Sequence, residues 1–145
     1  MEYQTLTSID SATMLQKNEI ADFLYTHLDE YGDQKADILK CLDYALSSFG
    51  HQGGFVVMGR ESGAIKGAVV VNHTGMSGYI PENILVYIAV HADQRGKGVG
   101  KELMQRAIKT AKGDIALHVE PDNPAKHLYE KIGFTNKYLE MRLKK

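Results

Sequence analysis

A glycine-rich stretch after a buried strand constrains this chain most. The run Ile84–Val90 is apolar almost throughout, as expected of a strand buried on both faces. It is followed by Gln94-Arg95-Gly96-Lys97-Gly98-Val99-Gly100 and then by a segment, residues 103–111, whose apolar residues recur at helical spacing. A strand, a glycine turn and a helix in this order predict an α/β unit whose backbone amides lie open at the start of the helix.

Such a turn favours a phosphate ligand. The first amides of a helix have no partner inside it, and the helix dipole adds partial positive charge there. Arg95, Lys97 and Lys101 supply cationic side chains, so we prefer phosphate binding to a plain tight turn. A nucleoside-triphosphate loop is excluded because the run G-x-x-x-x-G-K is missing. A dinucleotide fold with Glu120 on the ribose fits poorly, because only 25 residues follow that glutamate.

The remaining elements place this unit in one domain, residues 1–145. We expect a strand over 2–6, two amphipathic helices over 20–28 and 38–49, and a hairpin of 55–59 with 65–72. A polar loop over 74–83 precedes the buried strand, and a further strand is expected over 115–119. A helix capped at Asn123 and ended by Gly133 follows, and then a last strand over 134–143. The order β-α-α-β-β-β-α-β-α-β predicts an α/β sandwich with a mixed sheet.

Composition narrows the class of protein. A net charge of −1 argues against nucleic-acid binding, and no apolar run approaches the ~20 residues that cross a bilayer. The first residues have no signal-peptide pattern, so we expect a cytoplasmic protein. The lone Cys41 forms no internal disulfide and no metal cluster, and it reads as a small core side chain.

Two motifs in the second half resemble the GNAT superfamily of acyl-CoA-dependent N-acetyltransferases. Arg95, Gly98 and Gly100 match its Q/R-x-x-G-x-G/A motif, and residues 123–134, NPAKHLYEKIGF, resemble its segment ending in L-Y-E-K-x-G-F. Ala92 departs from the proline common at that place. The resemblance implies a GNAT-like sandwich and an enzyme that moves an acetyl group from acetyl-CoA to a primary amine, with no metal.

The resemblance also implies how the cofactor lies. The diphosphate would rest on the amides of residues 95–100, and the pantetheine arm would pair with Ile88 and Val90 like another strand. The neighbouring strand, 115–119, would splay away to admit it. The cofactor-binding residues expected on this basis are Ile88, Val90, Arg95, Gly96, Lys97, Gly98, Val99, Gly100, Lys101, Asn123 and Tyr129.

Tyr129 matches the family tyrosine that donates a proton to the departing thiolate, so we expect it to be the general acid. The base is open: Glu82 acting through a water is one candidate, and His73, His118, Glu120 or a water chain are others. His91 resembles a residue that shapes the turn after the buried strand.

The acceptor site is expected in the first half of the chain. Residues 10–50 contain eight acidic and three basic residues, which favours a cationic amine such as a polyamine, an amino sugar or a lysine side chain. Aromatic residues that would line its mouth are Tyr25, His27, Tyr31 and Tyr79. The alternative function is a catalytically silent CoA-binding sensor or interaction module, and a homodimer stays open.

Overall fold

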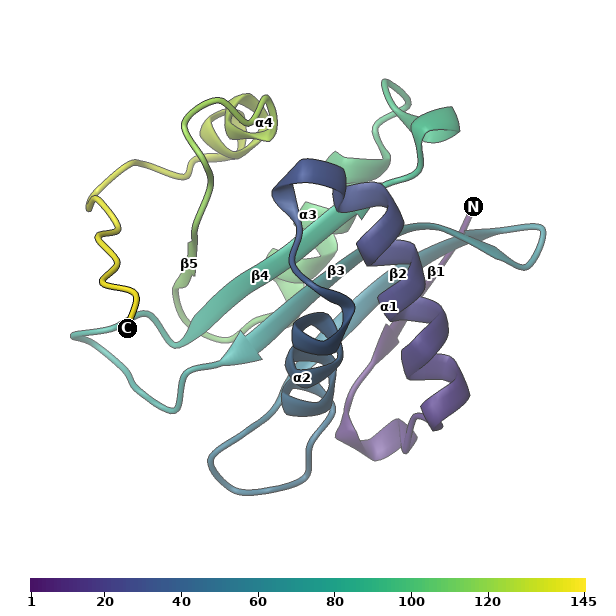
Figure 1. The fold of residues 1–145 in the computed structure, drawn as a ribbon, viewed down its shortest axis with the longest axis horizontal. Helices are drawn as coiled ribbons and strands as arrows, with labels where there is room; N and C mark the ends of the chain where they lie inside the picture. The colour runs from purple at the N-terminus through teal and green to yellow at the C-terminus, as the bar shows by residue number, and fades with distance from the viewer.

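The centre of the computed structural model, which describes every residue from Met1 to Lys145, is a mixed sheet of five strands (Figure 1). The strands are β1 (Glu2–Leu6), β2 (Gly54–Glu61), β3 (Ala64–His73), β4 (Asn83–Val90) and β5 (Ile115–Leu117). They lie in the sheet in chain order; the first three pairings are antiparallel, and β4 pairs with β5 in parallel. The predicted mixed sheet is therefore confirmed.

Helices cover both faces of the sheet. The helices are α1 (Met14–Leu28), α2 (Lys35–Ala45), α3 (Val99–Thr110) and α4 (Ala125–Ile132), with short 3-10 turns η1 (Ser8–Asp10), η2 (Asp29–Tyr31) and η3 (Ala92–Gln94). Figure 1 shows α1 and α2 in front of the sheet and α3 behind it. None of these helices is both long and apolar enough to cross a membrane.

Alternate side chains of the strands supply two cores. In β2, Val56 and Met58 pack with α1 and α2, whereas Phe55 and Val57 pack with α3 and with Tyr129 of α4. Burying one such side chain contributes roughly 1.5–3 kcal/mol, so a sheet with two apolar faces needs a helical layer on each. This explains why the strands read as continuous apolar runs.

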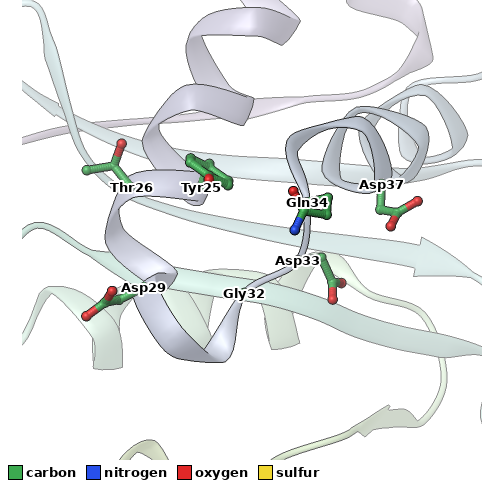
Figure 2. A pocket seen from close by; sticks show the side chains of 7 residues that line it. All are labelled: Tyr25, Thr26, Asp29, Gly32, Asp33, Gln34 and Asp37. Carbon is green, nitrogen blue, oxygen red and sulfur yellow. The ribbon is translucent and has the colours of Figure 1, made fainter.

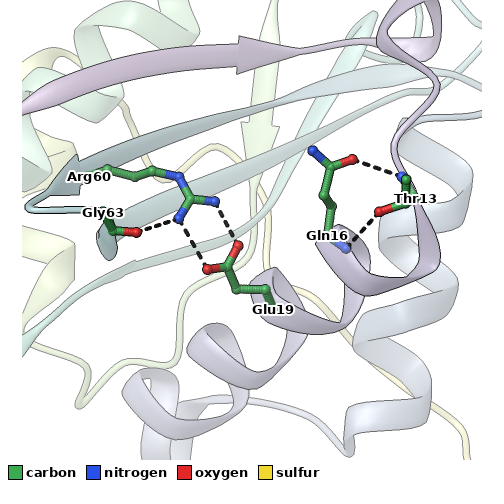
Figure 3. A network of polar contacts seen from close by, with 5 residues as sticks. All are labelled: Thr13, Gln16, Glu19, Arg60 and Gly63. Carbon is green, nitrogen blue, oxygen red and sulfur yellow. Dashed lines mark hydrogen bonds and ion pairs between the residues drawn. The ribbon is translucent and has the colours of Figure 1, made fainter.

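A polar network holds α1 against the β2–β3 hairpin (Figure 3). Thr13 and Gln16 cap the first turn of α1 reciprocally, each side chain accepting the other's backbone N–H. One turn further on, the Glu19 carboxylate accepts two hydrogen bonds from the Arg60 guanidinium, at 2.7 and 3.1 Å, and the same guanidinium donates to the Gly63 carbonyl. The Glu19–Arg60 pair thus links α1 to the hairpin of β2 and β3, next to the buried contacts of α1 with the sheet.

The expected end of the second helix is wrong. The helix α2 stops at Ala45, and Phe49, placed by periodicity on its inner stripe, lies in the following loop with 76% of its surface exposed. The Ser47 hydroxyl accepts the N–H of Phe49 at 3.0 Å. Serine side chains compete in this way with helical backbone bonds, which explains the early end.

The last expected strand is also absent, because residues 134–145 form neither helix nor strand. Leu139, Met141 and Leu143 alternate with charged residues, which favours a strand, yet each is more than 80% exposed. A strand exists only where its backbone pairs with another, and the adjacent β5 offers an edge of just three residues.

Candidate functional site

The strands β4 and β5 separate after a short pairing and leave a wedge between them. Only Asn83, Ile84 and Leu85 of β4 pair with β5, at Ile115–Leu117. From residue 87 to 90, β4 still pairs with β3 but has no partner on its other edge. Figure 1 shows the two strands diverging, with α4 beside the wide end of the wedge. Unpaired main-chain groups there can accept an extended ligand as an additional strand.

The hydrogen bond at the end of β4 shows which backbone N–H groups of this strand point into the wedge. His91 donates its N–H to the Lys66 carbonyl, 2.8 Å away on the β3 side. Since successive N–H groups of a strand point to opposite edges, the N–H groups of Val90 and Ile88 point into the wedge. These are the two positions expected from the sequence to pair with the pantetheine arm.

A bulge in β4 sets which side chains face which layer. Val70 pairs with Tyr87 and Val71 pairs with Leu85, so Val86 is an extra residue without a partner in β3. As a result Leu85 packs with α3, whereas Tyr87, two residues on, packs with α1 and α2.

The glycine turn after β4 opens the start of α3. Gly96 and Gly98 have φ angles of 77° and 81°, in the left-handed region that favours glycine. The first helical bond runs from the Glu102 N–H to the Gly98 carbonyl at 3.0 Å, and no side chain caps the helix. The amides of Val99, Gly100 and Lys101 therefore lack helical partners and carry the positive end of the dipole.

A cavity of about 260 Å³ lies over these amides. It is lined by Val90, Gln94, Arg95, Gly96, Gly98, Val99, Gly100, Lys101 and Leu128. Seven of the eleven residues expected to bind the cofactor thus line one cavity, whereas Ile88, Lys97, Asn123 and Tyr129 do not. Gln94 and Leu128 also line the cavity but were not predicted to bind the cofactor; the helical spacing of Leu128 marks it only as an inner-stripe residue. A Cβ at Gly100 would lie 3.4 Å from the Leu128 side chain, so α4 packs closely on the start of α3.

Tyr129 lies next to Leu128 and faces the core behind the wedge. It is 7% exposed, and its hydroxyl makes no hydrogen bond to the protein. Its ring packs edge-on against that of Phe134, with the two ring centroids 6.1 Å apart. Burial raises the pKa of the Tyr129 phenol to about 12, so the group keeps its proton. The Asn123 side chain accepts the Ala125 N–H at 2.9 Å and thus helps to start α4.

None of the candidate bases lines the cavity over the α3 amides. The Glu82 carboxylate accepts the N–H of Asp114 at 2.7 Å and that of Gly78 at 3.1 Å, and these bonds lower the pKa of Glu82. His73, His118 and Glu120 have exposed side chains.

Two histidines pack together beside the glycine turn. The His91 ring accepts the Asp93 N–H at 3.1 Å and caps η3, in keeping with a role in shaping the turn. The His27 ring lies with its centroid 4.4 Å from that of His91 and 4.5 Å from that of Phe23. Burial lowers the pKa of His27, and His91 lowers it further. His27 is therefore a packed side chain of α1 and does not line the second cavity described next.

A second, wider cavity of about 610 Å³ lies where α1 turns into α2 (Figure 2). Its lining residues are Tyr25, Thr26, Asp29, Gly32, Asp33, Gln34 and Asp37. Of the aromatics expected at the mouth, only Tyr25 lines it; Tyr79 is 80% exposed on the loop before β4. No group of three or more His, Cys, Asp or Glu side chains is placed to hold a metal ion.

Two long-range hydrogen bonds hold the turn between α1 and α2. The Tyr87 hydroxyl of β4 donates to the Asp33 carboxylate. The Tyr31 hydroxyl donates to the Asp122 carbonyl, at 3.3 Å, on the segment between β5 and α4. The sequence pointed to Tyr31 and to the acidic balance of residues 10–50. It did not predict that Tyr31 pairs with Asp122 or Asp33 with Tyr87, because both bonds join residues far apart in the chain.

Comparison with known proteins agrees with this geometry. Residues 13–134 match the model of the acetyltransferase (GNAT) family. A ribosomal-protein-alanine N-acetyltransferase from Brucella melitensis biovar Abortus 2308 is 19% identical, with a TM-score of 0.65 over 99% of this chain and 98% of that one. An aminoglycoside 6'-N-acetyltransferase from Acinetobacter haemolyticus is 14% identical, with a TM-score of 0.68 over 100% and 98%. An aminoglycoside N-acetyltransferase in complex with CoA is 15% identical, with a TM-score of 0.66 over 99% and 95%.

At these identities the solved structures show a shared fold. No curated protein matches the sequence significantly.

Proposed function

Because this chain belongs to the acetyltransferase (GNAT) family, an acetyl-transferring group of enzymes, we propose that it moves an acetyl group from acetyl-CoA to a primary amine. The observation that carries the proposal is the open edge of β4 leading to an uncapped helix start. An open strand edge can bind an extended arm by main-chain hydrogen bonds, and an uncapped helix start can bind a phosphate.

Acetyl-CoA would lie first against the start of α3 and then along the open edge of β4. Its diphosphate would contact the amides of residues 98–101, with Arg95 and Lys101 beside them in the cavity. Its pantetheine arm would pair with the N–H groups of Val90 and Ile88. The second of these amides would lie near the thioester carbonyl, where negative charge develops as the amine attacks.

The reaction needs proton movements at two atoms. The acceptor must lose a proton from its ammonium form, whose ordinary pKa is about 10.4, before its nitrogen can attack. The carbon–sulfur bond then breaks, and the thiolate takes a proton that we assign to the Tyr129 hydroxyl. The amide nitrogen gives up its second proton, which restores the tyrosine through solvent, so the products are the acetamide, the thiol and one released proton.

We assign removal of the ammonium proton to water rather than to Glu82. A base binds protons less well once its oxygens accept backbone N–H groups, and the Glu82 carboxylate accepts those of Asp114 and Gly78. In this proposal the wide cavity beside the α1–α2 turn would admit that water from solvent.

The acceptor that suits this site best is a cationic amine. Asp29, Asp33 and Asp37 line the wide cavity, and no lysine or arginine lines it. A cavity lined by charge of one sign raises the local concentration of ligands of the other sign. Two of the similar structures are aminoglycoside N-acetyltransferases, whose substrates belong to this class.

Release of CoA thiol from acetyl-CoA, measured against a panel of amines, tests the proposal. The panel contains spermidine, an aminoglycoside, a lysine peptide and the neutral alcohol 1-butanol as a control. We expect thiol release with at least one amine and none with the alcohol. Saturable acetyl-CoA binding without thiol release on any amine would favour the CoA-binding module instead.

A further inference from the structure

The turn between α1 and α2 is tied to both arms of the wedge. Asp33, at one end of the turn, accepts the hydrogen bond of Tyr87 in β4. Tyr31, two residues earlier, donates to the Asp122 carbonyl on the segment that continues β5. A path through residues 31–33 therefore crosses from one arm to the other. We call residues 31–33 the bridge.

The bridge has little freedom to move. A Cβ at Gly32, between the two anchoring residues, would lie 2.8 Å from the Leu28 Cβ, so the backbone already packs against the end of α1. Tyr87 is 7% exposed, and burial and Asp33 both raise the pKa of its phenol, so its hydroxyl stays a donor. The two anchors and this close packing hold the bridge as a fixed wall.

The position of the wall follows from the bulge in β4. Val90 and Ile88 present their amides to the wedge, and Tyr87, the next residue back along the strand, points to the α1–α2 layer. An arm that starts at the glycine turn and runs along Val90 and Ile88 thus reaches the level of Tyr87 with its free end. The group at that end meets the bridge.

From this geometry we infer that the bridge limits the acyl group that the donor carries, with Tyr31 and Tyr87 as the residues that set its position. The inference rests on the proposed function, because it assumes an acyl-CoA in the wedge. A rigid wall at the tip accepts acetyl and rejects longer chains, since an extra methylene in a closed pocket changes discrimination by about 10- to 200-fold.

The test compares the affinities of CoA, acetyl-CoA and butyryl-CoA by calorimetry, which requires no acceptor. In the wild type, butyryl-CoA should bind at least about tenfold more weakly than acetyl-CoA. Tyr31→Phe removes the bond to Asp122 and should reduce that preference about fivefold or more, with unchanged affinity for CoA itself. Tyr87→Phe should act in the same direction.

Tyr25→Phe is the matched control, because Tyr25 lines the wide cavity beside Gly32 and Asp33 of the bridge but makes no hydrogen bond to either arm. It should keep the wild-type preference. If Tyr31→Phe acted only on the fold, it would weaken the binding of all three ligands together, and that result would overturn the inference. A wild type that binds acetyl-CoA and butyryl-CoA equally well would overturn it too. If none of the three ligands binds the wild type, the proposed function fails first.

Discussion

Replacing Tyr129 with phenylalanine should separate chemistry from folding. The Tyr129 hydroxyl makes no hydrogen bond to the protein, so its removal leaves no partner group unsatisfied, and the ring keeps its contact with Phe134. The free energy of unfolding should therefore change by no more than about 0.5 kcal/mol. The affinity for acetyl-CoA should stay within about threefold, because binding is assigned to backbone groups of β4 and of the start of α3 and not to the Tyr129 hydroxyl.

The effect on kcat can be bounded from the two acids involved. The pKa of Tyr129 is about 12, and that of a free thiol is about 8.5, so complete proton transfer to the thiolate is uphill by roughly 5 kcal/mol. A donor that is weaker than its acceptor helps only partly, which argues for the low end of general-acid effects, about 10²-fold or 2.7 kcal/mol. We expect kcat to fall by that factor.

The assay is steady-state thiol release with the best amine of the panel, between pH 6 and 10. Since the tyrosine stays protonated below its raised pKa, wild-type kcat should show no loss from its ionisation within this range. Tyr79→Phe, on the exposed loop, is the control and should leave kcat unchanged. An unaltered kcat for Tyr129→Phe, with chemistry shown to be rate-limiting, would refute the assignment.

Two further predictions concern the frame of the site. In Gly67→Ala the new Cβ would lie 2.8 Å from the Leu103 Cδ1 and 3.0 Å from the Val99 Cγ1, so overpacking should lower stability by roughly 1–3 kcal/mol and weaken CoA binding, in thermal and calorimetric measurements. Gly50→Ala, where a Cβ meets nothing within 4 Å, should do neither; equal behaviour of the two variants would contradict the packing argument. Glu82→Gln should lower the melting temperature at pH 7, because a carboxylate of lowered pKa stabilises the fold above its unfolded pKa of about 4.3. That stabilisation is lost as pH falls through the folded pKa, so the gap between Glu82→Gln and wild type should close below about pH 4, whereas an unchanged gap at pH 3 would exclude the ionised carboxylate as its source.

Local patterns predicted the parts of the site that lie close together in the sequence. The glycine turn, the buried strand before it and the helix after it follow from residues 84–111, and the cavity over the helix start contains most of the residues named in advance. The hairpin turn was also found, with Ser62 and Gly63 both at positive φ as a two-residue turn requires.

What sequence reasoning missed depends on contacts between distant segments. The bulge at Val86 depends on how β4 pairs with β3, and no feature of the β4 sequence by itself predicts it. The bonds Tyr87–Asp33 and Tyr31–Asp122 span 54 and 91 residues. The prediction of a final strand was wrong because it considered the local pattern alone. Leu139, Met141 and Leu143 do alternate with charged residues, but a strand also needs a partner edge to pair with, and the pattern does not show whether one is present.

The binding of CoA compared with that of pantetheine, which lacks the diphosphate and the nucleotide, tests the central claim most directly. Calorimetry on the wild type should show CoA binding at least about 100-fold more tightly than pantetheine, because the amides at the start of α3 hold the diphosphate. Gly98→Val places a β-branched residue at a φ of 81°, which should misalign those amides and bring the two affinities to within a few-fold of each other. Equal affinity of the wild type for both ligands, or full CoA affinity in Gly98→Val, would contradict the account.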